Sequence, residues 1–283
     1  MPLIKPGDAD YFGHSLSGIN LFPSSSMHVQ ARAGRIYVDD AGAGECPSVF
    51  IHSLAGNSRH WLWQLQHVRS EGCAIAFDLR GHGRSDPPDN GDYSLEACSE
   101  DLQAVVDALG VDQFILIGHS MGAAVATVYA ASHPEQVRGL VLVDPVGDQR
   151  LAPEQMQEFL IALDTRRYDE LIRDYWSTLA GPDRNVRDQV LRDLDRTPRA
   201  AVLGMLRALQ RTDLTHAVQS CDAPKLAVIT PHNNFPFSLH NVDATIETVI
   251  VPGTGHWLQM EKPEEFNALL DGFAAKVSAR PRP

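Results

Sequence analysis

Ser120 lies at the centre of Gly118-His119-Ser120-Met121-Gly122, which has the form G-x-S-x-G. The apolar run at residues 114–117 predicts a buried strand before it, and the small residues from Ala123 onward predict a helix after it. A sharp turn from strand to helix holds its central residue in a strained backbone conformation and lifts the side chain above the sheet edge. We therefore interpret Ser120 as a nucleophile.

A serine hydroxyl needs a base to take its proton, and that base is usually a histidine held by a carboxylate. Of the 12 histidines, His256 alone follows a late predicted strand in a glycine-rich loop, Pro252-Gly253-Thr254-Gly255-His256-Trp257. Such a loop can carry an imidazole back towards the serine. We therefore predict that His256 is the general base.

Composition narrows the classes of partner. The chain has 283 residues, 43% of them hydrophobic, which is enough for one large core with a smaller subdomain. A formal net charge of -12 argues against nucleic acid or an anionic membrane as a partner. The four cysteines show no C-x-x-C spacing, and no metal-ligand spacing is present, so we expect no metal site. We also expect a cytoplasmic protein, because we find neither a signal-peptide pattern nor an apolar run of membrane-spanning length.

Apolar runs alternate with helical patterns along most of the chain, which is typical of an α/β fold with a mostly parallel sheet covered by helices on both faces. Residues 1–27 are rich in Gly, Ser and Pro, and we expect an N-terminal extension there. A hairpin is expected from His28. The predicted buried strands lie at residues 48–52, 73–78, 114–117, 137–143, 225–230 and 245–251, and the predicted helices include residues 94–109 and 263–277.

This alternation stops after Asp144. Between there and residue 222, four segments show helical spacing with no strand between them: residues 153–163, 168–180, 186–194 and 198–209. We predict that residues 145–222 form a helical cap over the carboxyl edge of the sheet, where ligands bind in open α/β sheets. The core would then comprise residues 28–144 and 223–283.

Over roughly residues 28–278 the chain resembles enzymes of the α/β-hydrolase fold. Four features occur in the order of that family: His52 with its loop, the segment from Asp78 to Ser85, the elbow at Ser120, and Gly255-His256 before the last helix. The resemblance implies that Ser120 is the nucleophile, that His256 is the base, and that the backbone N–H groups of Leu54 and Met121 form the oxyanion hole. It implies no cofactor.

The oxyanion loop departs from the family pattern. It usually begins His-Gly, whereas here it reads His52-Ser53. The extra side chain would narrow the pocket or add a hydroxyl near the substrate. We take Ser53, His119 and Trp257 as candidate pocket residues because they neighbour the loop, the nucleophile and the base in sequence.

The usual acid is also absent. In most members it follows the strand predicted at residues 225–230, but this chain has Thr230-Pro231-His232-Asn233-Asn234 there, without a carboxylate. Some relatives, including one group of haloalkane dehalogenases, place the acid after the preceding strand. That position is Asp144 here, 24 residues after Ser120. We hypothesise that Asp144 orients His256, with Asn233, Asn234 and Asp148 as open alternatives.

These residues together predict hydrolysis of a carboxylic ester, thioester or lactone through an acyl-serine intermediate. The substrate would be a small molecule with an apolar part. A serine elbow argues against epoxide hydrolase and dehalogenase chemistry, in which relatives use aspartate. Carbon–carbon bond hydrolysis, amide hydrolysis and cofactor-free haloperoxidase or perhydrolase chemistry use the same triad and stay open, as does a non-catalytic binding protein on the same scaffold.

Overall fold

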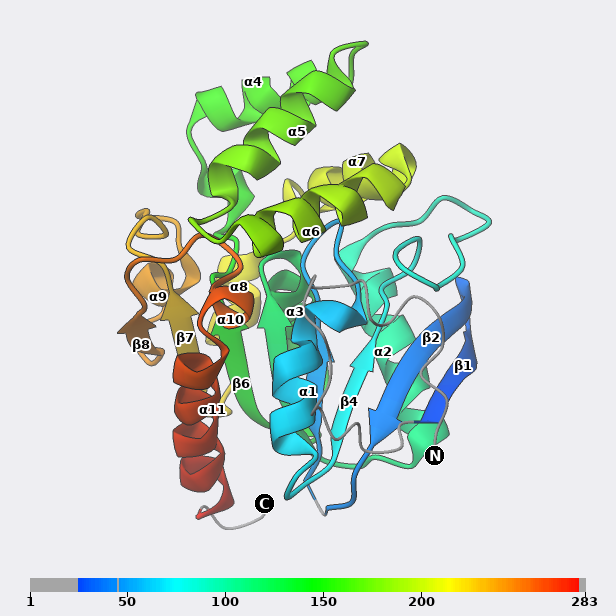
Figure 1. The fold of residues 1–283 in the computed structure, drawn as a ribbon, viewed down its shortest axis with the longest axis vertical. Coiled ribbons are helices and arrows are strands. Elements are labelled where there is room, and N and C mark those ends of the chain that lie inside the picture. The colour runs from blue at the N-terminus through cyan, green and yellow to red at the C-terminus, as the bar shows by residue number, and fades with distance from the viewer. Residues whose placement is uncertain (1–24, 45, 280–283) are drawn as a thin grey trace.

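An eight-stranded sheet forms the centre of the protein (Figure 1). The computed structural model describes residues 25–279 except Glu45. The strand order is β1-β2-β4-β3-β5-β6-β7-β8, in which β1 and β2 are antiparallel to their neighbours and the other strands run parallel. The strands are β1 (Ser25–Ala31), β2 (Gly34–Ala41), β3 (Ser48–Ile51), β4 (Ala74–Phe77), β5 (Phe114–His119), β6 (Val137–Val143), β7 (Lys225–Ile229) and β8 (Glu247–Ile250).

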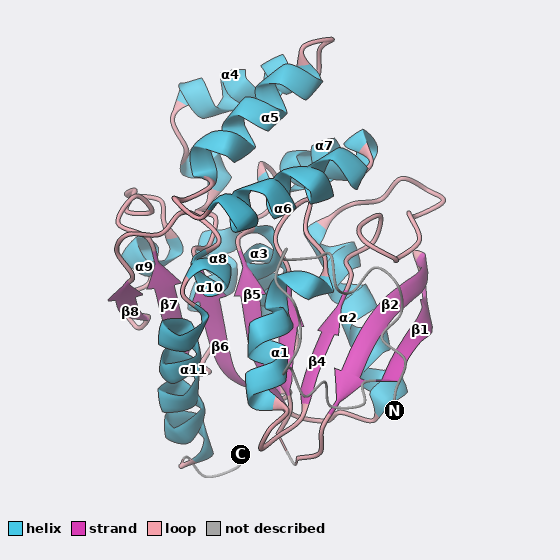
Figure 2. Cartoon of the chain, in the orientation of Figure 1, coloured by secondary structure: helices cyan, strands magenta, loops and turns pink. Residues whose placement is uncertain are grey.

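Helices cover both faces of this sheet, as Figure 2 shows. One face carries α1 (Leu62–Val68) and α11 (Pro263–Ser278), and the other carries α2 (Leu95–Leu109), α3 (Met121–Ser132) and α8 (Leu214–Gln219). The central strands β3, β4, β5 and β7 are buried along their whole length, because side chains on both faces meet a helical layer. The predicted fold class is confirmed.

The first hairpin and the nucleophile strand differ from the sequence prediction at their ends. Strand β1 begins at Ser25, so the last three residues of the expected extension belong to the sheet, while residues 1–24 lie outside the described residues. Strand β5 continues to His119 because Gly118 and His119 still pair with Leu142 and Val143 of β6. Helix α3 then starts at Met121, which leaves Ser120 alone in the turn.

Five α-helices lie between β6 and β7, one more than the sequence predicted. We use "cap helices" for the first four, α4 (Glu154–Leu163), α5 (Tyr168–Leu179), α6 (Arg184–Arg196) and α7 (Arg199–Leu209). Helices α6 and α7 lie across the carboxyl ends of the strands, and α4 and α5 project beyond them (Figure 1). The fifth helix, α8, contacts α3 and completes a layer of the core. Its six residues are too few for a helical period to stand out in sequence.

The remaining short elements lie around the carboxyl edge of the sheet. They are two 3-10 helices, Ser58–Trp61 and Gln149–Leu151, and two one-turn helices, α9 (Leu239–Val242) and α10 (Leu258–Glu261). Helix α10 follows the His256 loop directly and leads into α11. No helix among residues 25–279, Glu45 apart, is both long and apolar enough to cross a membrane.

Candidate active site

Ser120 occupies a strained turn between β5 and α3. Its φ is 54° and its ψ is -112°, a left-handed conformation that side chains rarely adopt. The two glycines of the motif have a steric role: a Cβ at Gly118 would overlap the carbonyl of Gly122, and a Cβ at Gly122 would overlap the carbonyls of Ile51 and His52. Both positions of the motif therefore require glycine, because α3 starts in direct contact with β5 and with the end of β3.

The structure brings His256 and Asp144 together. His256 Nδ1 lies 2.6 Å from Asp144 Oδ2, although the two residues are 112 positions apart. Asp144 follows β6 with a φ of 37°, and its other oxygen, Oδ1, accepts hydrogen bonds from Thr230 N at 2.8 Å, Thr230 Oγ1 at 3.1 Å and Asn233 Nδ2 at 3.2 Å. The carboxylate is thus fixed by residues at the end of β7.

The other candidates for the acid lie elsewhere. Asn233 contacts Asp144 and the carbonyl of Pro145, so it supports the acid and is not the group against the His256 ring. Asn234 accepts a hydrogen bond from Asn241. Asp148 is buried and binds Arg150 and Thr215.

These contacts also set the protonation of the pair. Burial acts to raise the pKa of Asp144, but the hydrogen bonds from His256, Thr230 and Asn233 outweigh it and hold the pKa below its usual value. Asp144 is therefore a carboxylate at neutral pH. When His256 is neutral, Nδ1 carries the proton that binds Asp144, and Nε2 keeps the lone pair that a general base needs.

His119 forms a hydrogen bond with the loop that carries His256. It is fully buried, and its Nε2 donates to the carbonyl of His256 at 2.8 Å while its Nδ1 accepts from Gln259 Nε2 at 3.2 Å. Burial lowers the pKa of His119 well below its usual range, so the ring is neutral. A neutral ring that donates at one nitrogen and accepts at the other satisfies both contacts.

His52 has the same kind of role in the predicted oxyanion loop. Its Nδ1 donates to the carbonyl of Ser53 at 2.7 Å, and its Nε2 accepts from Leu79 N at 2.9 Å. The turn continues through Ala55, which has a φ of 55°. Within the described residues, no backbone carbonyl accepts from the N–H of Leu54 or of Met121.

The three residues expected to line a pocket are buried. Ser53, His119 and Trp257 expose 2%, 0% and 1% of their surfaces, and the Ser53 Oγ and Trp257 Nε1 atoms are enclosed in protein. Their place at a substrate pocket stays a prediction.

An aromatic residue of the cap packs against Trp257, the residue after His256. Trp176 of α5 is buried with its ring centroid 6.4 Å from that of Trp257. Its neighbour Tyr175 keeps 36% of its surface exposed, and burial together with the charge of Asp144 raises the pKa of its phenol. Phe159 of α4 packs against Tyr175 at 5.0 Å between ring centroids.

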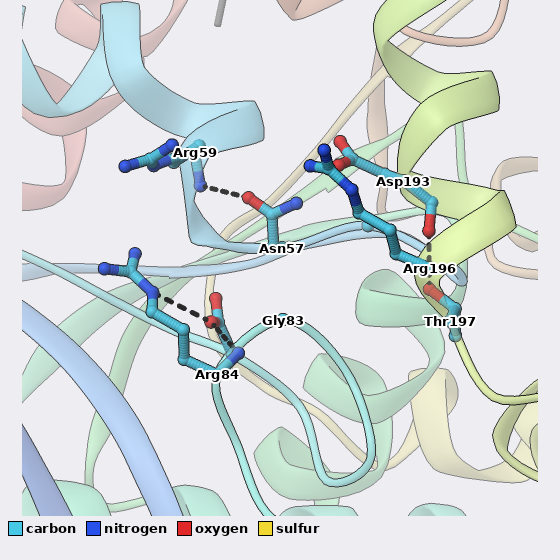
Figure 3. A pocket seen from close by; sticks show the side chains of 9 residues that line it. Asn57, Arg59, Gly83, Arg84, Asp193, Arg196 and Thr197 are labelled. Carbon is cyan, nitrogen blue, oxygen red and sulfur yellow. Dashed lines mark hydrogen bonds and ion pairs between the residues drawn. The ribbon is translucent and has the colours of Figure 1, made fainter. Parts of the chain in front are cut away.

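A separate cavity of about 220 Å³ lies beside this site (Figure 3). Its lining comes from the segment after the oxyanion loop, the segment after β4 and helix α6, and consists of Gly56, Asn57, Arg59, Asp78, Gly83, Arg84, Asp193, Arg196 and Thr197. No member of the proposed triad lines it. The buried Asp78 accepts from Ser58 N at 2.6 Å and from Arg84 N at 2.8 Å, so it holds the two loops together.

Residues 49–263 match the family described as alpha/beta hydrolase fold. The chain belongs to the α/β hydrolase fold family. This confirms the resemblance inferred from the sequence motifs. In the part of this α/β hydrolase that the structure describes, no group of three or more His, Cys, Asp or Glu residues could hold a metal ion.

Individual relatives of this α/β hydrolase have different activities. It is 28% identical over 83% of its length to the dihydrolipoyllysine-residue acetyltransferase component of an acetoin cleaving system from Pseudomonas putida, of which it spans 65%. It is 27% identical to the 2-(acetamidomethylene)succinate hydrolase of Mesorhizobium japonicum, with 82% of this chain and 89% of that protein covered. A solved structure of an N-acyl homoserine lactone degrading enzyme matches with a TM-score of 0.75 and 25% identity, covering 87% of this chain and 100% of that one.

Sequence reasoning missed the residues that support the pair in this α/β hydrolase. Thr230 and Gln259 carry no motif, and they become significant only where β7 ends beside Asp144 and α10 packs on His119. Asn233 had a usable signal, since it stands in the loop where the family's acid usually lies. Its amide donates to Asp144, the residue at the end of the neighbouring strand that contacts His256.

Proposed function

We propose that this α/β hydrolase cleaves a carboxylic ester, thioester or lactone through an acyl intermediate on Ser120. The observation that carries the proposal is the 2.6 Å contact between His256 Nδ1 and Asp144 Oδ2, in a chain whose strained elbow presents Ser120. An imidazole held in this tautomer is what a serine nucleophile requires.

The residues would act in a fixed order. His256 Nε2 takes the proton of Ser120 as Oγ attacks the carbonyl carbon, and the N–H groups of Leu54 and Met121 stabilise the oxyanion. His256 then gives the proton to the leaving alkoxide or thiolate. Water, deprotonated by His256, then attacks the carbonyl carbon of the acyl-serine. The bond from that carbon to Ser120 Oγ breaks, His256 returns the proton to Oγ, and the carboxylic acid is released. Asp144 stays ionised throughout and stabilises the imidazolium.

The substrate class follows from the cap side of the site. Phe159 and Tyr175 contact each other, and Tyr175 keeps exposed surface near Asp144, so an apolar acyl or alcohol group would pack there. The likeness to an N-acyl homoserine lactone degrading enzyme makes lactones with an apolar acyl chain part of the proposal.

A fluorophosphonate probe tests the nucleophile. We expect covalent labelling of the wild-type protein and no labelling of Ser120→Ala. Ser132→Ala, at the last residue of α3, is the matched control and should label as wild type does. A folded wild-type protein that stays unlabelled would favour the non-catalytic binding protein.

A substrate panel tests the reaction. Activated esters of graded acyl length, one thioester and acylated lactones should show turnover that Ser120→Ala abolishes. Turnover should rise with an apolar acyl chain. Equal rates for polar and apolar acyl groups would contradict the assignment of the cap aromatics.

A further inference from the structure

The loop that carries His256 contacts the cap directly. We use "base loop" for residues 252–257 and "cap elbow" for residues 180–183, which connect α5 to α6. The N–H of His256 donates to the carbonyl of Leu179, the last residue of α5, at 2.9 Å. A Cβ on Gly255 would overlap the backbone of Gly181, and a Cβ on Gly181 would overlap the backbone of Gly255. The two segments therefore meet backbone to backbone.

One side chain joins these two segments. Glu261, the last residue of α10, accepts a hydrogen bond from the N–H of Gly255 at 3.0 Å. A Cβ on Gly181 would overlap both carboxylate oxygens, so the carboxylate lies directly against the elbow.

The surroundings of Glu261 distinguish it from an ordinary surface acid. It is half-buried, and among the described residues neither Lys nor Arg forms an ion pair with it. Burial raises the pKa of Glu261 and the charge of the nearby Asp183 adds to this, while the hydrogen bond from Gly255 acts in the opposite direction. The carboxylate thus accepts from the N–H of the base loop and lies against the backbone of the cap elbow. Hydrogen bonds of this kind to a charged acceptor are about twice as strong as neutral ones.

We propose that Glu261 is a positioning residue that fastens the base loop to the cap elbow and so holds His256 in place for Ser120. The inference rests on the proposed roles of Ser120 and His256. In this proposal the cap elbow helps to position His256, in addition to lying over the site. The base loop is then held from two sides, by His119 at the carbonyl of His256 and by Glu261 and Leu179 at the N–H groups.

Glu261→Gln is the direct test, since it keeps the shape and removes the charged acceptor. The matched control is Glu264→Gln, the same change three residues later at an exposed position in the first turn of α11. For a small activated ester we expect Glu261→Gln to lower kcat and the fluorophosphonate labelling rate about tenfold, with KM nearly unchanged, because a displaced base slows proton transfer. Glu264→Gln should match wild type in all three.

Gly181→Ala tests the same contact between the base loop and the cap elbow, with the change made on the cap side. The added methyl group would overlap Glu261 and Gly255, so we expect the same signature, a lower kcat and a nearly unchanged KM. Glu261→Asp keeps the charge on a shorter side chain and should restore part of the labelling rate. These two variants carry the test if Glu261→Gln does not fold.

The outcomes separate this inference from the proposed function. A wild-type protein that is not labelled at Ser120 overturns both. A labelled wild type with Glu261→Gln equally fast overturns only the role of Glu261, and a loss of thermal stability at unchanged kcat would make Glu261 a purely structural residue. A rise in KM alone for Gly181→Ala would also contradict the proposal, because the elbow would then act on substrate binding.

Discussion

The Asp144 carboxylate is fixed on both of its oxygens. Oδ2 faces the imidazole of His256, and Oδ1 receives Thr230 and Asn233. The charge is buried, so leaving it without these partners would cost several kcal/mol. The same contacts hold the pKa of Asp144 below its usual value, which keeps it ionised at neutral pH.

Replacing Asp144 by Asn should remove most of the turnover. The amide keeps an acceptor for Thr230 but can present an N–H to His256 Nδ1, which favours the wrong tautomer of the ring. We expect kcat for an activated ester to fall by about 10⁴. Steady-state kinetics measure this.

Asp148→Asn is the control for that experiment, since it makes the same change at another buried acid between β6 and the cap helices. Asp148 binds Arg150 and Thr215, so this variant should lose stability and keep turnover. Near-wild-type turnover in Asp144→Asn would refute the assignment of the acid.

At the scale of elements, the site depends on how closely α3 approaches the strands. Helix α3 starts where Gly122 touches the carbonyls of Ile51, the last residue of β3, and His52, the first residue of the predicted oxyanion loop. The position of Met121 N relative to Leu54 N is therefore set by this one contact. A helix that moved away by a fraction of an ångström would change the elbow and the proposed oxyanion hole together.

Gly122→Ala should push the start of α3 away from the end of β3. The new methyl group has no space, so we expect a loss of about 1–3 kcal/mol in the free energy of unfolding and a marked fall in kcat. Denaturant unfolding and kinetics measure the two effects.

Gly272→Ala provides the comparison, because nothing lies within 4 Å of its added Cβ in α11. The substitution should stabilise the protein by about 0.5–1 kcal/mol and leave kcat unchanged. If the two variants behaved alike, contact between α3 and β3 would not be what Gly122 provides.

Across the whole molecule, buried neutral histidines gather at the carboxyl edge of the sheet. His52, His82 and His119 are buried, and burial lowers the pKa of each, that of His82 to about 4. A histidine with a lowered pKa in the folded state takes up its proton first in the unfolded chain, whose pKa is about 6.5. Its contribution to stability is therefore intact above about pH 6.5 and falls as the pH drops from there to the folded pKa.

His82→Asn should reduce this acid sensitivity. His82 donates from Nδ1 to the carbonyl of Arg80 at 3.0 Å, a contact that an Asn amide can replace. Between about pH 6 and 4.5, each such histidine adds about 1.4 kcal/mol per pH unit to the loss of unfolding free energy. We therefore expect the free energy of unfolding of His82→Asn to fall less steeply than that of the wild type over this pH range, by about 1.4 kcal/mol per pH unit. Identical slopes for the two proteins in denaturant titrations would show that His82 is protonated in the folded state.

Local patterns in the sequence were sufficient for the fold class and for placing Ser120 at a strand-to-helix turn and His256 in a loop after a late strand. These signals extend over a few residues, so they survive without knowledge of the fold. Helix α8 was missed because a single turn and a half has too little periodicity. Element ends also shifted, since pairing with β6 extends β5 through a glycine.

Only the tertiary structure decided which groups meet. Asp144, Asn233, Asn234 and Asp148 were all open from sequence, and the packing of β6 beside β7 places Asp144 against His256 with Asn233 behind it. The same packing buries Ser53, His119 and Trp257 and brings Glu261 to the cap elbow. Such contacts join residues far apart in the chain, and their geometry depends on how whole layers pack, which no short stretch of sequence encodes.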